Sequence, residues 1–472
     1  MNRRCFIAQS GLVTAGVAAG LPLFARNLQE FPPVRTPPAD RRFTSAAVEA
    51  AIKKVQQSVG NKELAWLFGN CFPNTLDTTV EFSMVNGRPD TYVITGDIDA
   101  MWLGDSTAQV WPYLSLVKED AQLRQLIAGV INRQTQNVLY DPYANAFYKE
   151  RDKVGEWKND LTDMKPGLHE RKWEIDSLCY TVRLAHGYWK TTGDTSVFND
   201  DWKQAAALIV NTFKEQQRKE GKGPYKFERN TSWATDGVPL GGYGYPVKPN
   251  GLICSTFRPS DDATIYLYLI PANYFAVVSL RQMAGIVNAV YKDASLAQQC
   301  TALADEVAGA LRQHATAVHP QLGKILAYEV NGMGSYNLMD DANVPSLLSL
   351  PYLGAVSKTD PLYLATRRFV LSEANPFYFK GTAGEGIGGP HVGVDMIWPL
   401  SIIMRGLTST SDAEIKACIN SLVASHGDTG FMHEAFHKND AKKFTRKWFA
   451  WANTLFGELV WETFNRRKAL LA

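Results

Sequence analysis

The spacing of helical segments constrains the fold of this chain more than any other feature. About a dozen stretches are predicted as helices, and several place apolar residues at the 3.6-residue period of an amphipathic helix. They cover residues 45–59, 105–118, 120–137, 174–192, 201–219, 264–292, 295–316, 345–356, 361–373, 393–408, 411–425 and 445–468. Short turns alternate with six long connections rich in Gly, Trp and Asp, at residues 60–104, 138–173, 220–263, 317–344, 374–392 and 426–444.

This alternation of short and long connections is typical of a ring of helical hairpins. We therefore predict an all-α fold, an (α/α)6 barrel whose long loops form the active-site face, because loops at one end of a rigid scaffold carry binding and catalytic residues. The chain shows no repeat of fixed period, which disfavours an α-solenoid. Strand-like alternation is scarce, and residues 91–95 and 325–330 are its best cases.

Charge and hydropathy exclude several classes of partner. Lys and Arg total 49 against 47 Asp and Glu, so the formal charge is only +2 and no nucleic-acid partner is indicated. No stretch reaches about 18 uninterrupted apolar residues, so no membrane span is predicted. The cysteines form neither a CxxC pair nor a Cys/His metal pattern, and no cofactor is indicated.

The N-terminus has the layout of an export signal. Arg3 and Arg4 precede the apolar, small-residue stretch 11–24, which ends near Ala25. The same start resembles a twin-arginine motif. We therefore expect residues 1–25 to be a signal peptide and the protein to be exported, periplasmic or secreted. A Pro-rich linker (26–44) and one catalytic domain (45–472) are expected to follow.

The first long connection carries three acids around an aromatic residue. Asp97, Asp99 and Asp105 flank Met101 and Trp102. Helix capping explains Asp105 alone, but not all three acids. In a sugar site such acids accept hydrogen bonds from hydroxyl groups, while the Trp covers the ring.

A pair of adjacent acids, Asp261 and Asp262, follows Arg258 and precedes a strongly apolar helix. A helix cap accounts for one of them. Two neighbouring carboxylates raise each other's pKa, and a general acid for glycosidic cleavage needs a raised pKa. Either Asp can therefore be catalytic, and the pattern alone does not separate them.

Glu434 lies in a Gly-led loop before a Trp-rich helix, where it could deprotonate a water. A plainer alternative is a solvated carboxylate paired with Lys438 or Arg446. His433 and His437 complete a formal HExxH pattern, which would suggest zinc on a helix. The segment shows no helical period and no third ligand, so we predict no metal.

Other polar and aromatic residues lie in the same long connections or at their ends. Each alone is explained by turn or cap formation, but their joint placement on the loop side favours a substrate pocket. They are Trp173, Glu174, Asp176, Trp233, Asp340, Asp341, Asn343, Glu385 and His391.

Taken together, these motifs resemble those of glycoside hydrolase family 125, the exo-α-1,6-mannosidases. The resemblance runs from about residue 61 to residue 466, and its motifs read DIDAMWLGDSTAQVWPYL, FRPSDDA, MDDANVP, AGEGIGGPH, HGDTGFMHEAF and FTRKWFAWANTLFGEL. It implies an (α/α)6 barrel that cleaves terminal α-1,6-linked mannose from glycans with inversion and without a metal ion. It also implies a general acid at Asp261, with Asp262 as the alternative, and a general base at Glu434.

Two other functions are compatible with the same pocket. An (α/α)6 sugar epimerase works through His residues on cytoplasmic sugars, which the export signal disfavours. A non-catalytic glycan-binding protein would keep the pocket and lack the reaction.

Overall fold

The computed structural model describes residues 31–471, of which residues from Val34 onward form one packed unit. The predicted signal peptide, 1–25, lies outside the described residues. Of the linker expected at residues 26–44, residues 26–30 also lie outside the described residues, and residues 34–44 belong to the packed unit. There the Arg35 Nε donates to Asp77 Oδ2 at 2.7 Å, and the Arg42 N–H donates to the Asp77 carbonyl at 3.0 Å. Within residues 31–471, no helix combines the length and apolarity of a membrane span.

Thirteen α-helices are found in the described residues. They are α1 (Ala46–Ser58), α2 (Lys62–Cys71), α3 (Asn74–Thr78), α4 (Leu103–Val110), α5 (Ala121–Tyr140), α6 (Ile175–Thr192), α7 (Asp200–Gln216), α8 (Ile270–Ile286), α9 (Ala294–His314), α10 (Pro361–Val370), α11 (Pro399–Thr408), α12 (Asp412–Ala424) and α13 (Ala450–Arg467). Short helical turns occur at η1 (Pro38–Asp40), η2 (Trp111–Ser115), η3 (Val287–Tyr291) and η4 (Lys468–Leu471).

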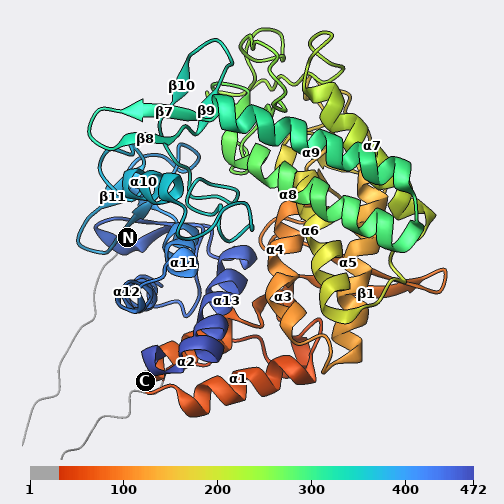
Figure 1. Ribbon diagram of the computed structural model, residues 1–472. Helices are drawn as coiled ribbons and strands as arrows, with labels where there is room; N and C mark the ends of the chain where they lie inside the picture. The colour runs from red at the N-terminus through yellow and green to blue at the C-terminus, as the bar shows by residue number, and fades with distance from the viewer. Residues whose placement is uncertain (1–30, 472) are drawn as a thin grey trace, which may run out of the picture. The chain divides into compact units, whose positions relative to one another are not determined.

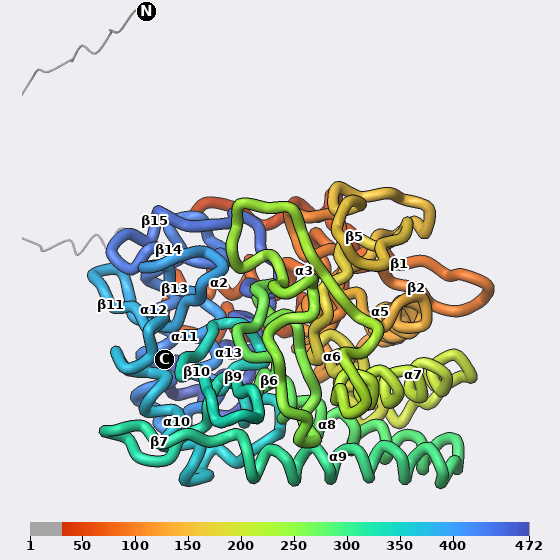
Figure 2. The backbone as a smooth tube through the Cα atoms, turned by 90° about the horizontal axis from the view of Figure 1, so that it is seen from above, coloured from red at the N-terminus to blue at the C-terminus, as the bar shows by residue number. Residues whose placement is uncertain are grey.

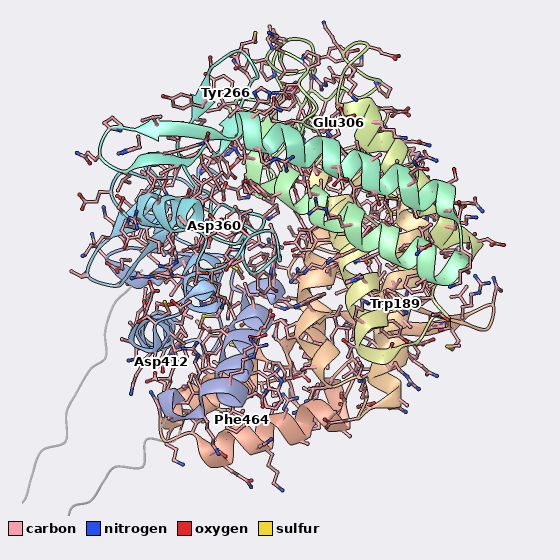
Figure 3. All side chains as sticks on the ribbon, viewed as in Figure 1. Trp189, Tyr266, Glu306, Asp360, Asp412 and Phe464 are labelled. Atoms are coloured by element: carbon pink, nitrogen blue, oxygen red, sulfur yellow. The ribbon has the colours of Figure 1, made fainter. Side chains whose placement is uncertain are left out.

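The helices form an inner and an outer row. In the inner row, α8 contacts α6, α6 contacts α4, α4 contacts α13, and α13 contacts α11. In the outer row α5 packs against α6 and α7, α7 against α9, α9 against α8, and α12 against α11. Figure 1 shows α7 and α9 outside α6 and α8. Outer helices bury one stripe, as α9 does with Leu296, Cys300, Leu303, Val307 and Leu311, whereas α13 buries almost every residue. Side chains fill the space between the rows (Figure 3).

Side-chain capping separates the two rows. The outer-row helices, α10 and the N-terminal α1 and α2 begin at side chains that accept a hydrogen bond from the first turn. These caps are Ser45, Asn61, Asp120, Asn199, Asp293, Asp360 and Ser411. No side-chain cap is found for the inner helices α4, α6, α8, α11 and α13. At the other end of α6, Gly193 ends the helix with φ +74°, as its position in the sequence predicts.

Several predicted boundaries need correction, and the helices predicted from residues 393 and 445 begin at Pro399 and Ala450, after the strands β13 (Met396–Ile397) and β15 (Asp440–Thr445). Residues 345–356 form turns rather than a helix, because Pro351 lacks an N–H and the Asp340 carboxylate takes two N–H groups of this segment. The helix predicted from residue 264 begins at Ile270, since Tyr268–Leu269 pairs as a strand and Pro271 suits the first helical turn. Helices α2 and α3 lie within a segment predicted as a connection.

Short strands occur mainly in and beside the long connections and tie them together. They are β1 (Val80–Val85), β2 (Arg88–Val93), β3 (Met101–Trp102), β4 (Ala146–Phe147), β5 (Leu168–Glu170), β6 (Tyr268–Leu269), β7 (Thr316–His319), β8 (Gly323–Leu326), β9 (Glu329–Val330), β10 (Tyr336–Asn337), β11 (Tyr378–Lys380), β12 (Glu385–Ile387), β13 (Met396–Ile397), β14 (Ala435–His437) and β15 (Asp440–Thr445). Two antiparallel sheets, ordered β3-β4-β5 and β13-β14-β15, each join two connections. In Figure 2, β5, β14 and β15 lie on the side of the view opposite α8 and α9. Most strands are too short to show alternation in sequence, which explains why few were expected.

Candidate active site

A cavity of about 440 Å³ is lined by residues from all six connections that the sequence predicts to be long. Each connection contributes at least one side chain, in chain order Trp102, Glu170, Asp261, Asn343, His391 and Glu434. First-turn or N-cap residues of the inner helices α4, α6, α11 and α13 line the same cavity. The long connections therefore meet at the N-terminal ends of the inner helices, and the cavity lies on the long-loop face that the sequence predicts for the active site.

The structure brings many of the predicted site residues together in this cavity. Its lining includes Trp102, Asp105, Glu174, Asp176, Trp233, Asp261, Asp262, Asn343, His391 and Glu434. The other predicted residues are not part of its lining. These are Asp97, Asp99, Met101, Trp173, Arg258, Asp340, Asp341 and Glu385.

Three of the residues outside the lining are buried in the framework around the site. Met101 is fully buried in β3. Trp173 is also buried, and its indole N–H donates to the Cys254 carbonyl at 2.7 Å. Arg258 forms a buried ion pair, with its Nε donating to Glu329 Oε1 at 2.7 Å. Their side chains are already engaged by the protein, so they support the site rather than face it.

The two acids before Trp102 have different surroundings. Asp97 accepts a hydrogen bond from Arg446 Nε at 2.9 Å, and Arg446 itself lines the cavity. Asp97 therefore acts on the site through this arginine. Asp99 has a side chain that is 70% exposed and pairs with Lys153 at 2.8 Å, so it lies on the surface.

The remaining three acids serve loop structure. Both carboxylate oxygens of Asp340 accept backbone N–H groups of the following turn, at 2.8 and 3.0 Å. Asp341 accepts a hydrogen bond from Ser260 Oγ at 2.8 Å and thereby touches the loop that carries Asp261. Glu385 pairs with Arg405 at 3.0 Å.

Asp261 is held in an unusual backbone conformation at the edge of the cavity. Its φ is +68°, in the left-handed region that non-glycine residues rarely adopt. The carboxyl group accepts a hydrogen bond from Asn145 Nδ2 at 3.0 Å, and Lys172 Nζ lies 3.9 Å from the same oxygen. Burial raises the pKa of Asp261 to about 6, although Lys172 opposes the shift. This carboxyl group can therefore hold a proton near neutral pH.

Asp262 has a different environment from its neighbour. Its side chain is almost fully buried, and its Oδ1 lies 3.6 Å from His391 Nδ1. Burial lowers the pKa of His391, but the hydrogen bond and charge of Asp262 raise it to about 9, with Asp261 and Glu434 contributing. At neutral pH His391 is therefore a cation that pairs with Asp262. The geometry favours Asp261 over Asp262 as the group that carries a transferable proton.

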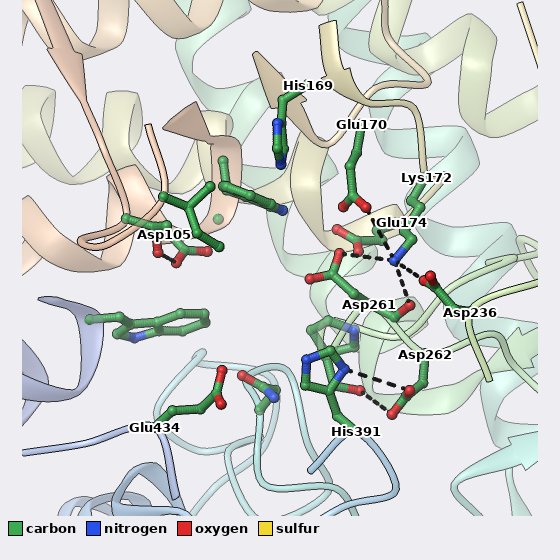
Figure 4. Close-up of a pocket in the computed structure, with 18 of the residues that line it drawn as sticks. Asp105, His169, Glu170, Lys172, Glu174, Asp236, Asp261, Asp262, His391 and Glu434 are labelled. Atoms are coloured by element: carbon green, nitrogen blue, oxygen red, sulfur yellow. Dashed lines mark hydrogen bonds and ion pairs between the residues drawn. The ribbon is translucent and has the colours of Figure 1, made fainter. Parts of the chain in front are cut away.

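Glu434 faces Asp261 across the cavity (Figure 4). It immediately precedes β14, is buried, and lies 3.4 Å from Arg446 Nη1. His433 stacks on Phe444 with ring centroids 3.6 Å apart, and burial lowers its pKa to about 4. Because residues 435–437 form a strand, the segment lacks the helical geometry of an HExxH zinc site. Within residues 31–471 no group of His, Cys, Asp and Glu is arranged to hold a metal.

Two further carboxyl groups of the cavity have raised pKa values, which favours their protonated forms. Burial, together with Asp261 and Asp176, raises the pKa of Glu174 well above its usual value. Burial also raises the pKa of Asp176 to about 8, with help from Asp261 and Asp105. Protonated carboxyl groups both donate and accept hydrogen bonds, which suits the hydroxyl groups of a sugar.

Several buried polar atoms of the cavity residues have no hydrogen-bond partner among the described residues. They are Asp176 Oδ1, Trp102 Nε1, Asn343 Nδ2 and Trp398 Nε1. Buried polar atoms are costly unless a partner satisfies them. A ligand rich in hydroxyl groups supplies such partners, so the cavity is suited to a carbohydrate.

A network of buried charges beside Asp261 was missed by the sequence analysis. Lys172 Nζ lies 2.6 Å from Asp236 and 3.5 Å from Glu170, and Arg229 pairs with both acids at 3.0 and 2.9 Å. Burial raises the pKa of Glu170, but Lys172 and Arg229 outweigh it and bring it to about 2. The only signal in the sequence was the run of charges before Trp173. That run did not reveal pairing with residues some 60 positions away.

Comparison with known proteins identifies the family. A family model described as metal-independent alpha-mannosidase (GH125) matches residues 61–461. This chain is a member of that family. It is therefore a glycoside hydrolase of the α-mannosidase class, which confirms the resemblance noted in the sequence and disfavours the epimerase and lectin-like alternatives.

Two relatives of this GH125 member match over most of their length. The "Meiotically up-regulated gene 157 protein" of Schizosaccharomyces pombe is 42% identical over 449 residues, which is 91% of this chain and 88% of that protein. A Streptococcus pneumoniae metal-independent α-mannosidase, solved in a non-productive complex with α-1,6-mannobiose, is 41% identical with a TM-score of 0.86. The alignment covers 90% of this chain and 100% of the streptococcal one.

A more distant structure bears on the fold alone. A bacterial glucoamylase bound to acarbose superposes with a TM-score of 0.53 at 12% identity, covering 87% of this chain and 57% of that chain. The predicted fold class is thus confirmed, since the helix-rich fold resembles glycosidases of the (α/α)6 barrel class. The turns at 345–356 contact two inner helices, since Tyr352 accepts from Arg183 of α6 through its carbonyl and donates to Glu458 of α13 through its hydroxyl.

Proposed function

We propose that this α-mannosidase releases terminal α-1,6-linked mannose from the ends of glycans with inversion of configuration. The observation that carries the proposal is the pair formed by Asp261 and Glu434. These two carboxyl groups face one cavity from opposite sides, and the pKa of Asp261 is raised to about 6. The complex of the streptococcal relative with α-1,6-mannobiose supports the choice of linkage.

In the proposed reaction Asp261 is the general acid and Glu434 the general base. Asp261 gives its proton to the glycosidic oxygen as the bond from that oxygen to C1 breaks, and the oxygen keeps the bonding electron pair. On the opposite face of the ring a water oxygen bonds to C1 while Glu434 takes a proton from that water. An inverting reaction needs room for this water, which corresponds to carboxyl groups about 6.5–9.5 Å apart. The sugar product is β-mannose.

The remaining cavity groups are proposed to bind the terminal sugar. The unpartnered polar atoms of Trp102, Asp176, Asn343 and Trp398 supply hydrogen bonds to its hydroxyl groups. Trp233, with 52% of its surface exposed, is proposed to contact the next sugar at the cavity entrance. Exo action is part of the same proposal and is supported by the lining of one cavity by side chains from all six connections.

Proton NMR of α-1,6-mannobiose digestion tests the proposal directly. The expected result is free mannose whose first-formed anomer is β, followed by slow mutarotation. Release of α-mannose first would refute inversion. A changed sugar identity would indicate epimerisation, and binding without any product would indicate a lectin.

We also propose that residues 1–25 direct export, on the basis of their sequence alone. Fusion of residues 1–44 to a reporter should send it out of the cytoplasm, whereas the same fusion with Arg3→Lys and Arg4→Lys should remain inside if export uses the twin-arginine route. A reporter that stays in the cytoplasm with the unaltered segment would contradict the proposal.

A further inference from the structure

A buried asparagine stands behind Asp261 and is absent from the cavity lining. Asn145 precedes β4 and is fully buried. Its side-chain Nδ2 donates to Asp261 Oδ1 at 3.0 Å and lies 3.4 Å from Glu174 Oε1. Its Oδ1 accepts the backbone N–H of Lys172 at 3.1 Å. Every polar atom of this side chain therefore has a protein partner.

The orientation of the Asn145 amide follows from its partners. A backbone N–H such as that of Lys172 can only donate, so the amide atom that faces it must be the oxygen. The nitrogen then faces Asp261 and can only donate to it. An oxygen that accepts this hydrogen bond is a poor place for a proton, so Asp261 Oδ1 is held in the unprotonated state.

The other carboxyl oxygen of Asp261 is left for the proton. Oδ2 has no hydrogen-bond partner among residues 31–471. Figure 4 shows the Asp261 carboxyl group reaching into the cavity, with Lys172 behind it. A proton on Oδ2 can therefore be directed at a bound substrate.

Lys172 restrains the backbone of Asp261. Its ammonium donates to the main-chain carbonyl of Asp261 at 3.1 Å. The lysine side chain is only 3% exposed, and Asp236 at 2.6 Å holds it in place. This contact restrains the residue whose left-handed φ of +68° is otherwise disfavoured.

We propose that Asn145 and Lys172 are positioning residues for the general acid, which lock the carboxyl group of Asp261 so that its proton sits on Oδ2. This inference rests on the proposed role of Asp261. Lys172 holds the main chain and, through its own N–H, orients Asn145, which holds the side chain. The charged and titratable groups that face Asp261 are Lys172, Glu170, His391, Asp105, Glu174 and Asp176.

The test compares two substrates that differ in their need for acid catalysis. α-1,6-Mannobiose has a poor leaving group and requires protonation, whereas α-mannosyl fluoride loses fluoride with little help. Asn145→Ala should reduce kcat on mannobiose by about 10²-fold, and on the fluoride by less than about threefold. Removal of a hydrogen-bond donor to the carboxylate disfavours the charged form, so the alkaline limb of kcat/KM should move to higher pH.

Two reference variants give these results their meaning. Asp261→Asn should lose mannobiose activity and keep fluoride activity, which establishes the signature of a lost general acid. Asn273→Ala removes a buried asparagine of α8 that binds only backbone groups, with Nδ2 donating to the carbonyls of Ile253 and Leu269. This control should affect both substrates alike and leave the pH profile in place.

An equal loss of activity on both substrates in Asn145→Ala, or an alkaline limb at unchanged pH, would overturn the positioning role. The proposed function would still be supported by a selective loss of mannobiose activity in Asp261→Asn. An equal loss of activity on both substrates in Asp261→Asn would instead overturn the assignment of Asp261 as the general acid. If Asn145→Ala does not fold, Asn145→Asp keeps the shape and the acceptor for the Lys172 N–H but lacks the donor. This variant should show the same selective loss of mannobiose activity. Its alkaline limb of kcat/KM should move further to higher pH, because it adds a carboxyl group beside Asp261. The absence of both effects would refute the inference.

Discussion

The ion pair between Arg258 and Glu329 offers the sharpest test of how the Asp261 loop is built. Arg258 precedes Asp261 by three residues and is 3% exposed in its side chain, while Glu329 is fully buried. The second oxygen of Glu329 lies 3.2 Å from the backbone nitrogens of Ile265 and Tyr266 and accepts from both N–H groups. The side chain of Glu329 therefore binds residues at both ends of the loop that carries the proposed general acid.

Arg258→Met should strongly destabilise the protein, because it leaves Glu329 buried without its cation. Breaking a buried pair on one side costs about 3–5 kcal/mol. Unfolding entropy of about 2.1 cal/mol/K per residue, summed over the packed unit that begins at Val34, is about 0.9 kcal/mol/K. The melting temperature should therefore fall by about 3–6 °C.

The double variant Arg258→Met/Glu329→Leu should be less destabilised than the sum of the single variants, because it leaves no buried charge unpaired. Differential scanning calorimetry measures these shifts, and mannobiose kinetics run alongside. Arg281→Met removes an exposed pair with Asp305 at 3.3 Å and serves as the matched control, with no measurable change in Tm. The reasoning fails if Arg258→Met keeps the native Tm and raises only KM, since Arg258 would then bind substrate, as its place in the sequence first suggested.

Three further predictions concern the cavity. Glu434→Gln should lower kcat on α-1,6-mannobiose by at least about 10³-fold. The Kd of the disaccharide, measured by calorimetry, should stay within a few-fold of the wild-type value. A variant with wild-type kcat would show that Glu434 is not the general base. Burial raises the pKa of Asp261 to about 6, and the acid must be protonated to act, so kcat/KM on mannobiose should fall as pH rises through this range. Asp261→Asn, measured on α-mannosyl fluoride, should not show this decrease. A decrease that persists in the variant would assign the pH dependence to another group. Trp102→Phe removes an unpartnered indole N–H and should raise KM by about tenfold with an unchanged Tm, whereas an unchanged KM would show that this N–H does not bind the sugar.

Local sequence patterns determined much of the helical framework. The apolar stripe of α9 and the Gly193 stop of α6 could be read directly, because the helical period and the left-handed C-cap are properties of neighbouring residues. The same holds for the alternation of short and long connections, which placed the site at the loop face. Motif resemblance added the family, which the comparisons confirm.

Tertiary structure alone decided the surroundings of each functional group. Asp261 and Asp262 are adjacent and chemically identical in the sequence, yet one accepts from Asn145 at the cavity edge and the other is buried against His391. Asn145 lies 116 positions from Asp261, in a stretch with no motif, and only folding brings its amide to the carboxyl group. The pKa of a carboxyl group depends on burial and on nearby charges, and these come from segments that are distant in the chain. The sequence therefore shows which residues carry carboxyl groups, and the packing of the six connections determines the pKa of each group and so which one can hold a proton near neutral pH.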